Sequence, residues 1–413
     1  MRLLRTDTYE VVEVGRTPPY AILSHRWEHE EITFKTLNSR ALQDANLSSF
    51  GKGLQVSARK IRGSCAIARK QGFDYIWIDT VCIDKSSSEE LSTALNSMFK
   101  WYHEAAICYT FFNDVLFSSH GPDMFNSFRE DRQGQRSEWF ERGWTLQELI
   151  APRKMEFYDV HWQPIGTRNE LASLVGKAAK IHPTYLNGKA DFRTACNAVK
   201  MSWMAGRRTQ EVEDIAYSLL GIFGVSLTPQ YGEGVKAFLR LQDAIMYDYG
   251  TMDESLFAWQ WPPDRELRCF RGDRRPHPKF SEHQWGLLAP SPDCFAYSWN
   301  VVVDQRKVKQ RINGGFHRMP QGIGVTTGYG DGKNFLGLNK SSISLALNCW
   351  RLNDRGSLET VVLELAGSSR KGWSRLDCHT LRSSSRSSVG RNWGQGAMGH
   401  HMLTVNQPYI RLP

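Results

Sequence analysis

Reactive and ligand-binding side chains follow three short apolar runs in the first part of the chain. The set comprises Ser24, His25, Arg26 and Trp27 after the first run, Asp79, Asp84 and Lys85 after the second, and Arg142, Trp144 and Glu148 beyond the third. Carboxylates and an imidazole suit acid–base or charge-stabilising chemistry, whereas cations and indoles suit anionic and aromatic ligands. Helix capping is the structural alternative, and it is strongest for Asp79 and Asp84 because Asp is a common N-cap residue.

The apolar runs and the patterns between them predict an open α/β domain with a flavodoxin-like parallel sheet. Strands are predicted at residues 20–23, 74–78, 106–112 and 154–158, and helices at 56–70, 86–102 and 137–149. Strands that alternate with amphipathic helices are typical of a parallel sheet covered by helices. Ligands bind such sheets beyond the carboxyl ends of the strands, near the point where the strand order reverses. We therefore expect the reactive side chains to gather at this edge.

The rest of the chain changes its pattern twice. Beyond the α/β domain the sequence lacks strand-like alternation, and helices are predicted at residues 168–179, 210–223 and 234–247. Further on, short apolar runs at 301–303, 343–347 and 361–365 are separated by turn residues, which indicates strands. The sequence thus predicts an α/β domain (1–165), a helical extension (166–255) and a C-terminal β-rich domain (256–413).

Composition excludes several classes of protein. The chain has 413 residues, and its 52 Lys and Arg against 43 Asp and Glu give a modest net charge of +9, which decides no ligand class. No apolar run has the length of a membrane-spanning helix, and no secretory signal is evident at the start, so we expect neither. The eight cysteines are scattered without a Cys-x-x-Cys pair, which is typical of reduced thiols in a cytosolic protein and predicts no metal site.

Three segments match a known family in order and with ordinary spacing. They read YAILSHRW at 20–27, YIWIDTVCIDK at 75–85 and WFERGWTLQEL at 139–149. These segments resemble the three blocks of the fungal heterokaryon incompatibility (HET) domain, and the resemblance extends to about residue 260. One departure is Arg26, where many relatives carry Thr or another small residue. The resemblance implies a cytoplasmic protein of non-self recognition and programmed cell death, with homotypic self-association or other incompatibility proteins as partners.

HET domains in turn resemble TIR domains, which share the flavodoxin-like order of elements. In many TIR domains a Trp-Cys-x-x-Glu-Leu motif on the helix after the third strand supplies a glutamate that cleaves NAD. The segment from Trp144 to Leu149 is similar, with Thr145 in place of Cys. The resemblance implies NAD as the substrate, no bound cofactor, and Glu148 as the first catalytic residue. A carboxylate suits this chemistry because loss of nicotinamide leaves an oxocarbenium-like ribose.

The remaining candidates take supporting roles in this hypothesis. His25 and Asp79 complete the catalytic set with Glu148. The substrate-binding residues are expected to be Ser24, Arg26, Trp27, Asp84, Lys85, Arg142 and Trp144. An indole can stack on a ring of the substrate, and cationic side chains can contact its pyrophosphate.

Other interpretations compete with NAD hydrolysis. The same domain can act without catalysis, as an interaction module that recruits partners. His25 and Cys82 can be read as the base and nucleophile of a hydrolase, and His25 with His29 as metal ligands that lack a third partner. The glycine-rich segment at 328–333 indicates a hairpin turn rather than a phosphate loop, and the basic segment at 265–279 a solvated linker rather than a nucleic-acid site.

Overall fold

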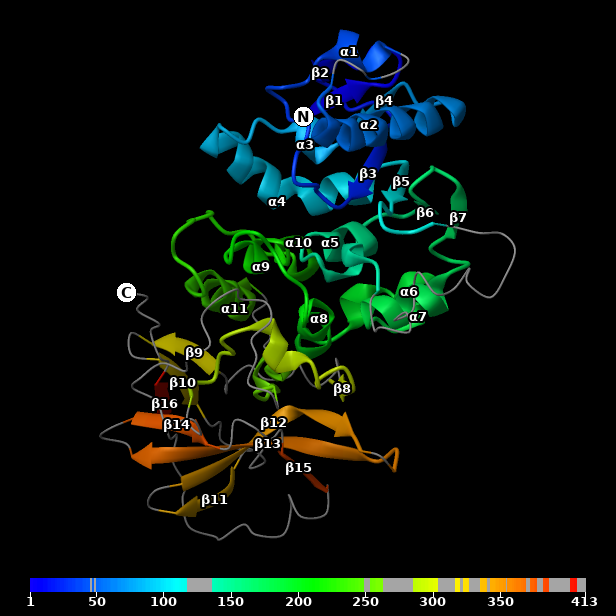
Figure 1. Cartoon of the computed structure of the whole chain (residues 1–413). Coiled ribbons are helices and arrows are strands. Elements are labelled where there is room, and N and C mark those ends of the chain that lie inside the picture. The colour runs from blue at the N-terminus through cyan, green and yellow to red at the C-terminus, as the bar shows by residue number, and fades with distance from the viewer. Residues whose placement is uncertain are drawn as a thin grey trace. The chain divides into compact units, whose positions relative to one another are not determined.

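The protein was analysed as a computed structural model, whose described residues divide into two compact units (Figure 1). The described residues are 1–44, 47, 50–116, 136–248, 253–262, 285–303, 316–319, 322–326, 335–339, 342–353, 355–368, 372–376, 382–385 and 402–406. The first unit holds residues 1–192 with 218–222, and the second holds 193–217 with 223–413. Every candidate site residue lies in the first unit. The division into three domains stays a prediction.

A seven-stranded sheet forms the centre of the described part of the first unit. Its strands are β1 (Arg2–Arg5), β2 (Val11–Glu13), β3 (Ala21–His25), β4 (Tyr75–Trp77), β5 (Ile107–Phe111), β6 (Met155–Tyr158) and β7 (Pro164–Thr167), in the spatial order β2-β1-β4-β3-β5-β6-β7. The four central strands β4, β3, β5 and β6 are parallel, and β1, β2 and β7 are added in antiparallel fashion. The sheet is therefore mixed, with a parallel centre.

The register of the central strands places their carboxyl ends at one edge. Ile22 of β3 lies opposite Trp77 of β4 on one side and opposite Cys108 of β5 on the other. After β3 the chain goes to β4 on one side and then to β5 on the other, so the strand order reverses between β3 and β5. All residues of β3 and β5 are buried, as expected for strands covered on both faces.

Helices that lie between the parallel strands position the candidate residues, and two of them, at 52–70 and 88–104, agree with the sequence predictions. They are α2 (Lys52–Lys70), α3 (Asp79–Cys82), α4 (Ser88–Glu104) and α5 (Thr145–Ile150). The side chain of Ser87 accepts a hydrogen bond from the backbone of Glu90 and so caps α4. Glu90 also forms a two-point ion pair with Arg2, with both N–O distances 2.7 Å, which ties β1 to the start of α4.

The predicted strands and helices of this unit are present, with two corrections. The sequence patterns missed β1, β2 and β7, which join the sheet through antiparallel pairing. The single helix predicted at 137–149 is wrong: a short 3-10 helix, η2 (Glu138–Glu141), is followed by a break and then by α5. The Thr145 hydroxyl donates to the carbonyls of Trp139 and Arg142 at 2.6 and 2.9 Å, and so takes up acceptors at the end of η2.

An aromatic cluster packs η2 against the central strands β5 and β6. Phe112 is fully buried and stacks on Phe140 and Phe157, with ring centroids 5.8 and 5.6 Å apart. Trp139 meets Phe112 edge to face at 5.6 Å. Such pairs stabilise beyond the burial of their area alone. The cluster holds the Trp139 indole against the face of β3 that carries the Ser24 side chain.

The remaining elements belong to the ends of the first unit and to the second unit. The helices are α1 (Ser39–Gln43), α6 (Ala172–Ala179), α7 (Pro183–Leu186), η3 (Phe192–Thr194), α8 (Asn197–Met204), α9 (Asp214–Tyr217), α10 (Leu220–Phe223), α11 (Lys236–Asp248), η4 (Glu254–Phe257) and η5 (Pro292–Phe295). The strands are β8 (Val301–Val302), β9 (Phe316–Met319), β10 (Gly322–Thr326), β11 (Phe335–Asn339), β12 (Ser342–Leu352), β13 (Leu358–Ser368), β14 (Gly372–Leu376), β15 (Arg382–Ser385) and β16 (Met402–Asn406). These strands pair into one sheet.

Several sequence predictions fall on the second unit or outside the described residues. Strands confirm the predicted β runs near 301, 343 and 361, and α11 confirms the helix near 234. The helix predicted at 210–223 is instead the two short helices α9 and α10. The glycine-rich and basic segments lie outside the described residues. Within the described part of the chain, no helix is long and apolar enough to cross a membrane.

Candidate functional site

A buried hydrogen-bonded chain links the Glu148 carboxyl to β3. The Ser24 hydroxyl donates to Glu148 Oε2 at 2.5 Å, and the Trp139 indole N–H donates to Ser24 Oγ at 3.0 Å. Ser24 is fully buried, Trp139 is 1% exposed and Glu148 is 6% exposed. Because Ser24 is the penultimate residue of β3, this chain brings Glu148 to the carboxyl end of the strand beside which the order reverses.

Burial changes the charge state of Glu148. It raises the pKa of the carboxyl to about 8, and the charge of Asp79 acts in the same direction. Hydrogen bonds from the Ser24 and Tyr102 hydroxyls and the charge of Arg142 oppose the rise without cancelling it. A carboxyl removed from water favours its neutral form, so Glu148 carries a proton at neutral pH in this conformation.

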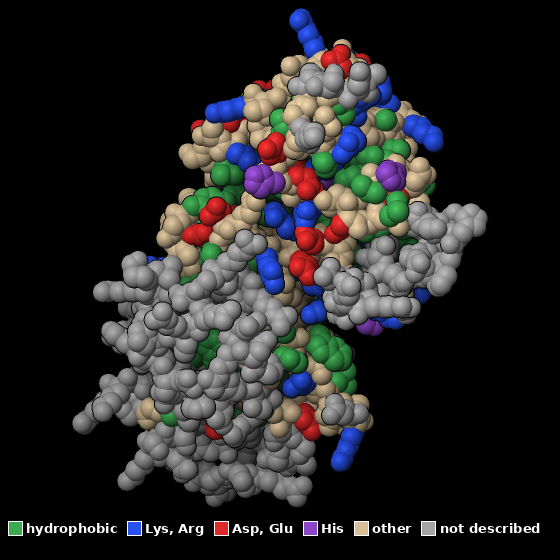
Figure 2. Space-filling model, viewed as in Figure 1, with side chains coloured by type: hydrophobic (Ala, Val, Ile, Leu, Met, Phe, Trp, Pro, Cys, Tyr) green, Lys and Arg blue, Asp and Glu red, His purple; other side chains and the backbone are tan. Residues whose placement is uncertain are grey.

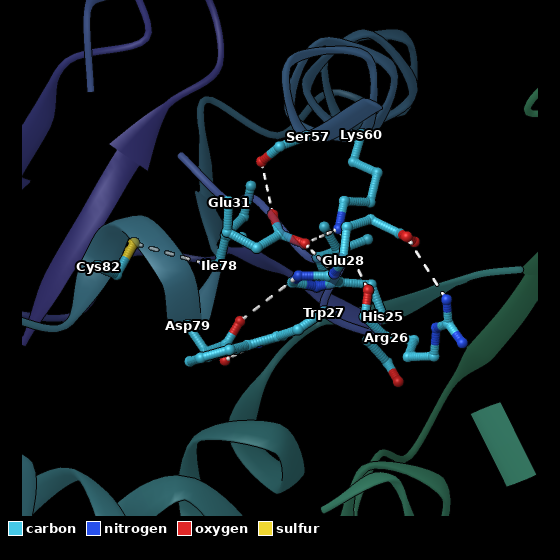
Figure 3. Close-up of polar contacts among 12 residues, drawn as sticks. His25, Arg26, Trp27, Glu28, Glu31, Ser57, Lys60, Ile78, Asp79 and Cys82 are labelled. Atoms are coloured by element: carbon cyan, nitrogen blue, oxygen red, sulfur yellow. Dashed lines mark hydrogen bonds and ion pairs between the residues drawn. The ribbon is translucent and has the colours of Figure 1, made fainter. Parts of the chain in front are cut away.

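A second cluster surrounds Asp79 at the start of α3, directly after β4. Figure 3 shows the His25 imidazole pointing toward Asp79, with Nε2 3.8 Å from Oδ1. The Trp27 indole N–H donates to Asp79 Oδ2 at 2.8 Å, and Lys85 Nζ lies 3.7 Å from the same oxygen. Burial alone would raise the pKa of Asp79, but Lys85, His25 and the Trp27 hydrogen bond lower it overall. Asp79 is therefore a carboxylate with three partners.

A buried ion pair supports the loop that carries Trp27. Lys60 on α2 pairs with Glu31, and their side chains are only 2% and 7% exposed. Lys60 Nζ also donates to the carbonyl of Arg26 at 3.2 Å, while Ser57 Oγ donates to Glu31 Oε2 at 2.6 Å. The Glu28 backbone N–H donates to Glu31 Oε1 at 2.7 Å. These contacts, drawn in Figure 3, fix the backbone after β3 from the α2 side.

The environment of His25 keeps its imidazole neutral. Burial, and to a smaller extent the nearby Lys60 charge, lower the pKa of His25 to about 4, against the opposing charges of Asp79 and Glu31. Burial disfavours the charged form of an imidazole, so His25 is uncharged at neutral pH. His25 is thus a neutral imidazole beside the Asp79 carboxylate.

The structure separates the three predicted catalytic residues into two groups. Consecutive side chains of a strand point to opposite faces, so Ser24 and His25 of β3 face opposite sides of the sheet. Glu148 lies on the Ser24 side, whereas Asp79 lies against His25. The two groups share the carboxyl edge of the sheet, and the charge of Asp79 acts on Glu148 there.

Arg26 is held between acidic side chains at the same edge. It forms an ion pair with Glu28 at 3.4 Å and a close ion pair with Glu138 of η2. Its Nε is buried and has no hydrogen-bond partner. Glu28 in turn accepts a short hydrogen bond from Asn113 after β5. Arg26 therefore connects the loop after β3 to η2.

The other predicted binding residues have local roles in this structure. Asp84 accepts hydrogen bonds from the backbone and hydroxyl of Ser86, at 3.0 and 2.6 Å, and so forms a turn before α4. Trp144 is half-buried at the start of α5, and its carbonyl accepts from the Glu148 backbone N–H at 3.4 Å. Arg142 is half-buried and acts on Glu148 through its charge.

Sequence reasoning missed the buried residues Ser57, Lys60, Glu31 and Trp139. Ser57 and Lys60 lie on the same buried stripe of α2 as Ile61, at helical spacing. A lysine on such a stripe is unusual, because Lys is rarely buried without a partner. That position was the available signal in the sequence.

The structure argues against Cys82 as a nucleophile. Cys82 is buried and its Sγ accepts the Ile78 backbone N–H at 3.4 Å, and burial raises the pKa of the thiol to about 12. Such a thiol stays protonated and is a poor nucleophile at neutral pH. No group of three potential metal-ligating side chains comes together among the residues that the structure describes.

On the face shown in Figure 2, acidic and basic side chains of the described residues are interspersed. Nucleic acid is usually bound by a continuous basic surface. This face does not supply one among its described residues.

The Lys60–Glu31 pair predicts a strong non-additive effect on stability. Lys60→Met alone and Glu31→Gln alone should each lower the free energy of unfolding by about 3–5 kcal/mol, because each leaves a buried charge without its partner. The double variant should recover much of that loss. Urea unfolding of all four proteins, read as a double-mutant cycle, gives the coupling energy.

The exposed pair Lys100–Glu104 on α4 is a matched control, with side chains 71% and 49% exposed. Lys100→Met and Glu104→Gln should change stability by less than about 0.5 kcal/mol each. A coupling energy for Lys60 and Glu31 as small as that of the control would contradict the prediction.

The raised pKa of Glu148 predicts that stability falls toward alkaline pH. The folded protein holds the Glu148 proton up to about pH 8, whereas the unfolded chain releases it near the ordinary value of 4.5. The unfolded chain therefore binds fewer protons in this window, and stability decreases as pH rises. His25 has the opposite slope between about pH 4 and its ordinary value of 6.5, so the net decrease should begin above pH 6.5.

The expected loss between pH 6.5 and 8 is about 2 kcal/mol at most, from about 1.4 kcal/mol per pH unit. Glu148→Gln replaces the protonated carboxyl with a neutral group of the same shape and should remove this slope. Urea unfolding across the pH range measures both proteins. An unchanged slope in Glu148→Gln would rule out Glu148 as its source.

Comparison with family models agrees with the first two of the three motifs. Residues 20–133 match the family model described as heterokaryon incompatibility protein (HET). The chain is 40% identical over 264 residues to the vegetative incompatibility protein HET-E-1 of Podospora anserina. That match covers 61% of this chain and 18% of the relative, so the chain spans less than a fifth of the relative's length. No solved structure matches.

The matched range contains β3, α3 and the Lys60–Glu31 pair, and it ends before Glu148. The resemblance of the first two motifs to the HET family is therefore confirmed at the level of the domain. Residues 20–133 of the chain are therefore similar to the heterokaryon incompatibility (HET) domain, and the chain is similar over 264 residues to one vegetative incompatibility protein.

Proposed function

We propose that this chain acts in heterokaryon incompatibility, as a cytoplasmic protein that signals non-self recognition and programmed cell death. We further propose that its HET domain is TIR-like and hydrolyses NAD once copies of the domain associate. The observation that carries the enzymatic part is a buried, hydrogen-bonded glutamate with a raised pKa, at the carboxyl ends of the parallel central strands of the sheet. Perturbed carboxyls in such positions are frequent at active sites.

The order of the central strands supports the flavodoxin-like assignment. In chain order the parallel strands are β3, β4, β5 and β6, and their spatial order is β4-β3-β5-β6. This is the 2-1-3-4 beginning of a flavodoxin-like sheet, in which ligands bind where the order reverses. Glu148 stands on the helix after β5, at the position that the TIR resemblance requires.

The proposed reaction replaces one bond at the ribose carbon C1′ by another. The C1′–N1 bond between ribose and nicotinamide breaks, and its electron pair goes to the nicotinamide nitrogen. A water oxygen bonds to C1′, one O–H bond of that water breaks, and the proton passes to the solvent. Ionised Glu148 would stabilise the positive charge that develops on the ribose, as carboxylates do in glycoside hydrolysis.

The charge state of Glu148 supports the proposal that the reaction is controlled by a conformational change. In the described conformation Glu148 is buried and protonated at neutral pH, so it offers no negative charge to the ribose. A rearrangement that exposes Glu148 to water or to a cation would lower its pKa and supply the carboxylate. Self-association is the event that we assign to this step.

The test measures nicotinamide release from NAD by purified full chain over a concentration series, with and without artificial clustering. Release should rise more steeply than linearly with protein concentration. Glu148→Ala and Glu148→Gln should each lower the rate by at least about 100-fold, the usual scale for loss of a charge-stabilising group. Ser24→Ala should lower the rate less and shift its pH dependence upward, because the Ser24 hydroxyl favours ionised Glu148.

Glu89→Gln is the matched control, since Glu89 is exposed on the first turn of α4 and should leave the rate unchanged. Circular dichroism and gel filtration check that each variant folds. If clustered protein leaves NAD intact while its expression still kills cells, the HET domain acts as an interaction module instead. The buried Ser24–Glu148 bond would then be a structural contact.

A further inference from the structure

At the edge of the HET domain, the Trp27 ring and the Asp79 carboxylate hold the ammonium group of Lys85. Lys85 Nζ lies 3.1 Å from the centroid of the Trp27 ring, within the range of a cation–π interaction. The same ammonium group lies 3.7 Å from Asp79 Oδ2, which accepts the Trp27 indole N–H at 2.8 Å. Figure 3 shows Trp27 and Asp79 side by side. The two residues thus form a cation site filled by the chain's own lysine.

The parts of this site differ in how firmly they are held. Asp79 is fixed by Trp27 and by the buried His25, and its side chain is 17% exposed. The loop of Trp27 is fixed by Lys60, which donates to the neighbouring carbonyl of Arg26. The Lys85 side chain is 33% exposed and sits on a stem of four carbons with many rotamers. Lys85 can therefore leave while the ring and the carboxylate stay in place.

We propose that Trp27 and Asp79 form a binding site for a flat organic cation of the pyridinium type, which replaces Lys85 on the indole face. A flat ring covers the indole better than an ammonium group, and its positive charge keeps the Asp79 carboxylate paired. A neutral ring of the same shape lacks that charge, so it would leave Asp79 without a cation when Lys85 moves away. The site should discriminate by charge as well as by shape.

This inference goes beyond the proposed NAD hydrolysis, and only its link to NAD rests on that function. The nicotinamide ring of NAD is a pyridinium cation that becomes neutral when the glycosidic bond breaks. A site that prefers the cation would hold the substrate and release the product. Lys85 would act as an internal competitor that must move aside before a ligand binds.

The test uses full chain labelled with ¹⁵N at tryptophan, with Trp27→Phe to assign the Trp27 indole signal. The probes are 1-methylnicotinamide, a pyridinium cation without a cleavable ribose bond, and neutral nicotinamide. The cation should shift the Trp27 indole signal at concentrations up to about 10 mM, the range of weak ligands of this size. Nicotinamide should shift it much less. Because the cation has no ribose, the result is independent of NAD hydrolysis.

Two substitutions test the roles of Lys85 and Asp79 in binding the cation. Lys85→Met removes the internal competitor and should tighten binding of 1-methylnicotinamide by about fivefold or more, the scale of one cation–π contact. Asp79→Asn should weaken binding by a similar factor while keeping an acceptor for the indole N–H. Equal shifts from both probes, or no tighter binding in folded Lys85→Met, would overturn the proposal. So would unchanged affinity in folded Asp79→Asn.

Discussion

The hydrogen bond between Ser24 and Glu148 joins the end of β3 to α5 where both side chains are buried. A carboxyl in such a place is stable only when it is neutral or well paired. Ser24 supplies one hydrogen bond, and the Trp139 indole fixes Ser24 from the other side. The aromatic cluster around Phe112 then holds Trp139. The position of Glu148 thus depends on the aromatic packing on the face of the sheet that carries Ser24.

The opposite face of β3 carries several buried or half-buried charges that need partners. Lys60 and Glu31 are both buried and neutralise each other, while Asp79 takes its partners from Trp27, Lys85 and His25. His25 remains neutral among these charges because burial and Lys60 disfavour its protonation. Both faces therefore keep their reactive groups neutral or internally paired. Such an arrangement is what the proposed gating by association requires.

Sequence patterns predicted the centre of the sheet better than its margins. The central strands are continuous apolar runs, because helices bury them on both faces, and they were found within one or two residues. β1, β2 and β7 are short, and their identity depends on antiparallel partners that no local pattern reveals. The helix predicted at 137–149 failed because Thr145 bonds to the carbonyls that end η2.

The candidate site was predicted in part. Position after a strand indicated His25, Asp79 and Trp27, and the structure brings these three together. The pairing of Glu148 with Ser24 was not predicted, since it depends on how α5 packs against β3. Asp84 has a local structural role, because it forms a turn with Ser86 before α4, while Ser87 caps that helix. The burial of Lys60 could not be predicted from its helical stripe alone, because it depends on the tertiary contact with Glu31.

The most direct test is the ionisation of Glu148 itself, measured by ¹³C NMR of the side-chain carboxyl in dispersed and in clustered protein. Comparison with Glu148→Gln identifies the signal. In dispersed protein the carboxyl should titrate with a pKa of about 8, and in clustered protein its pKa should fall toward the ordinary value. A pKa near 4.5 in dispersed protein, or the same raised value in both states, would contradict an association-gated carboxylate.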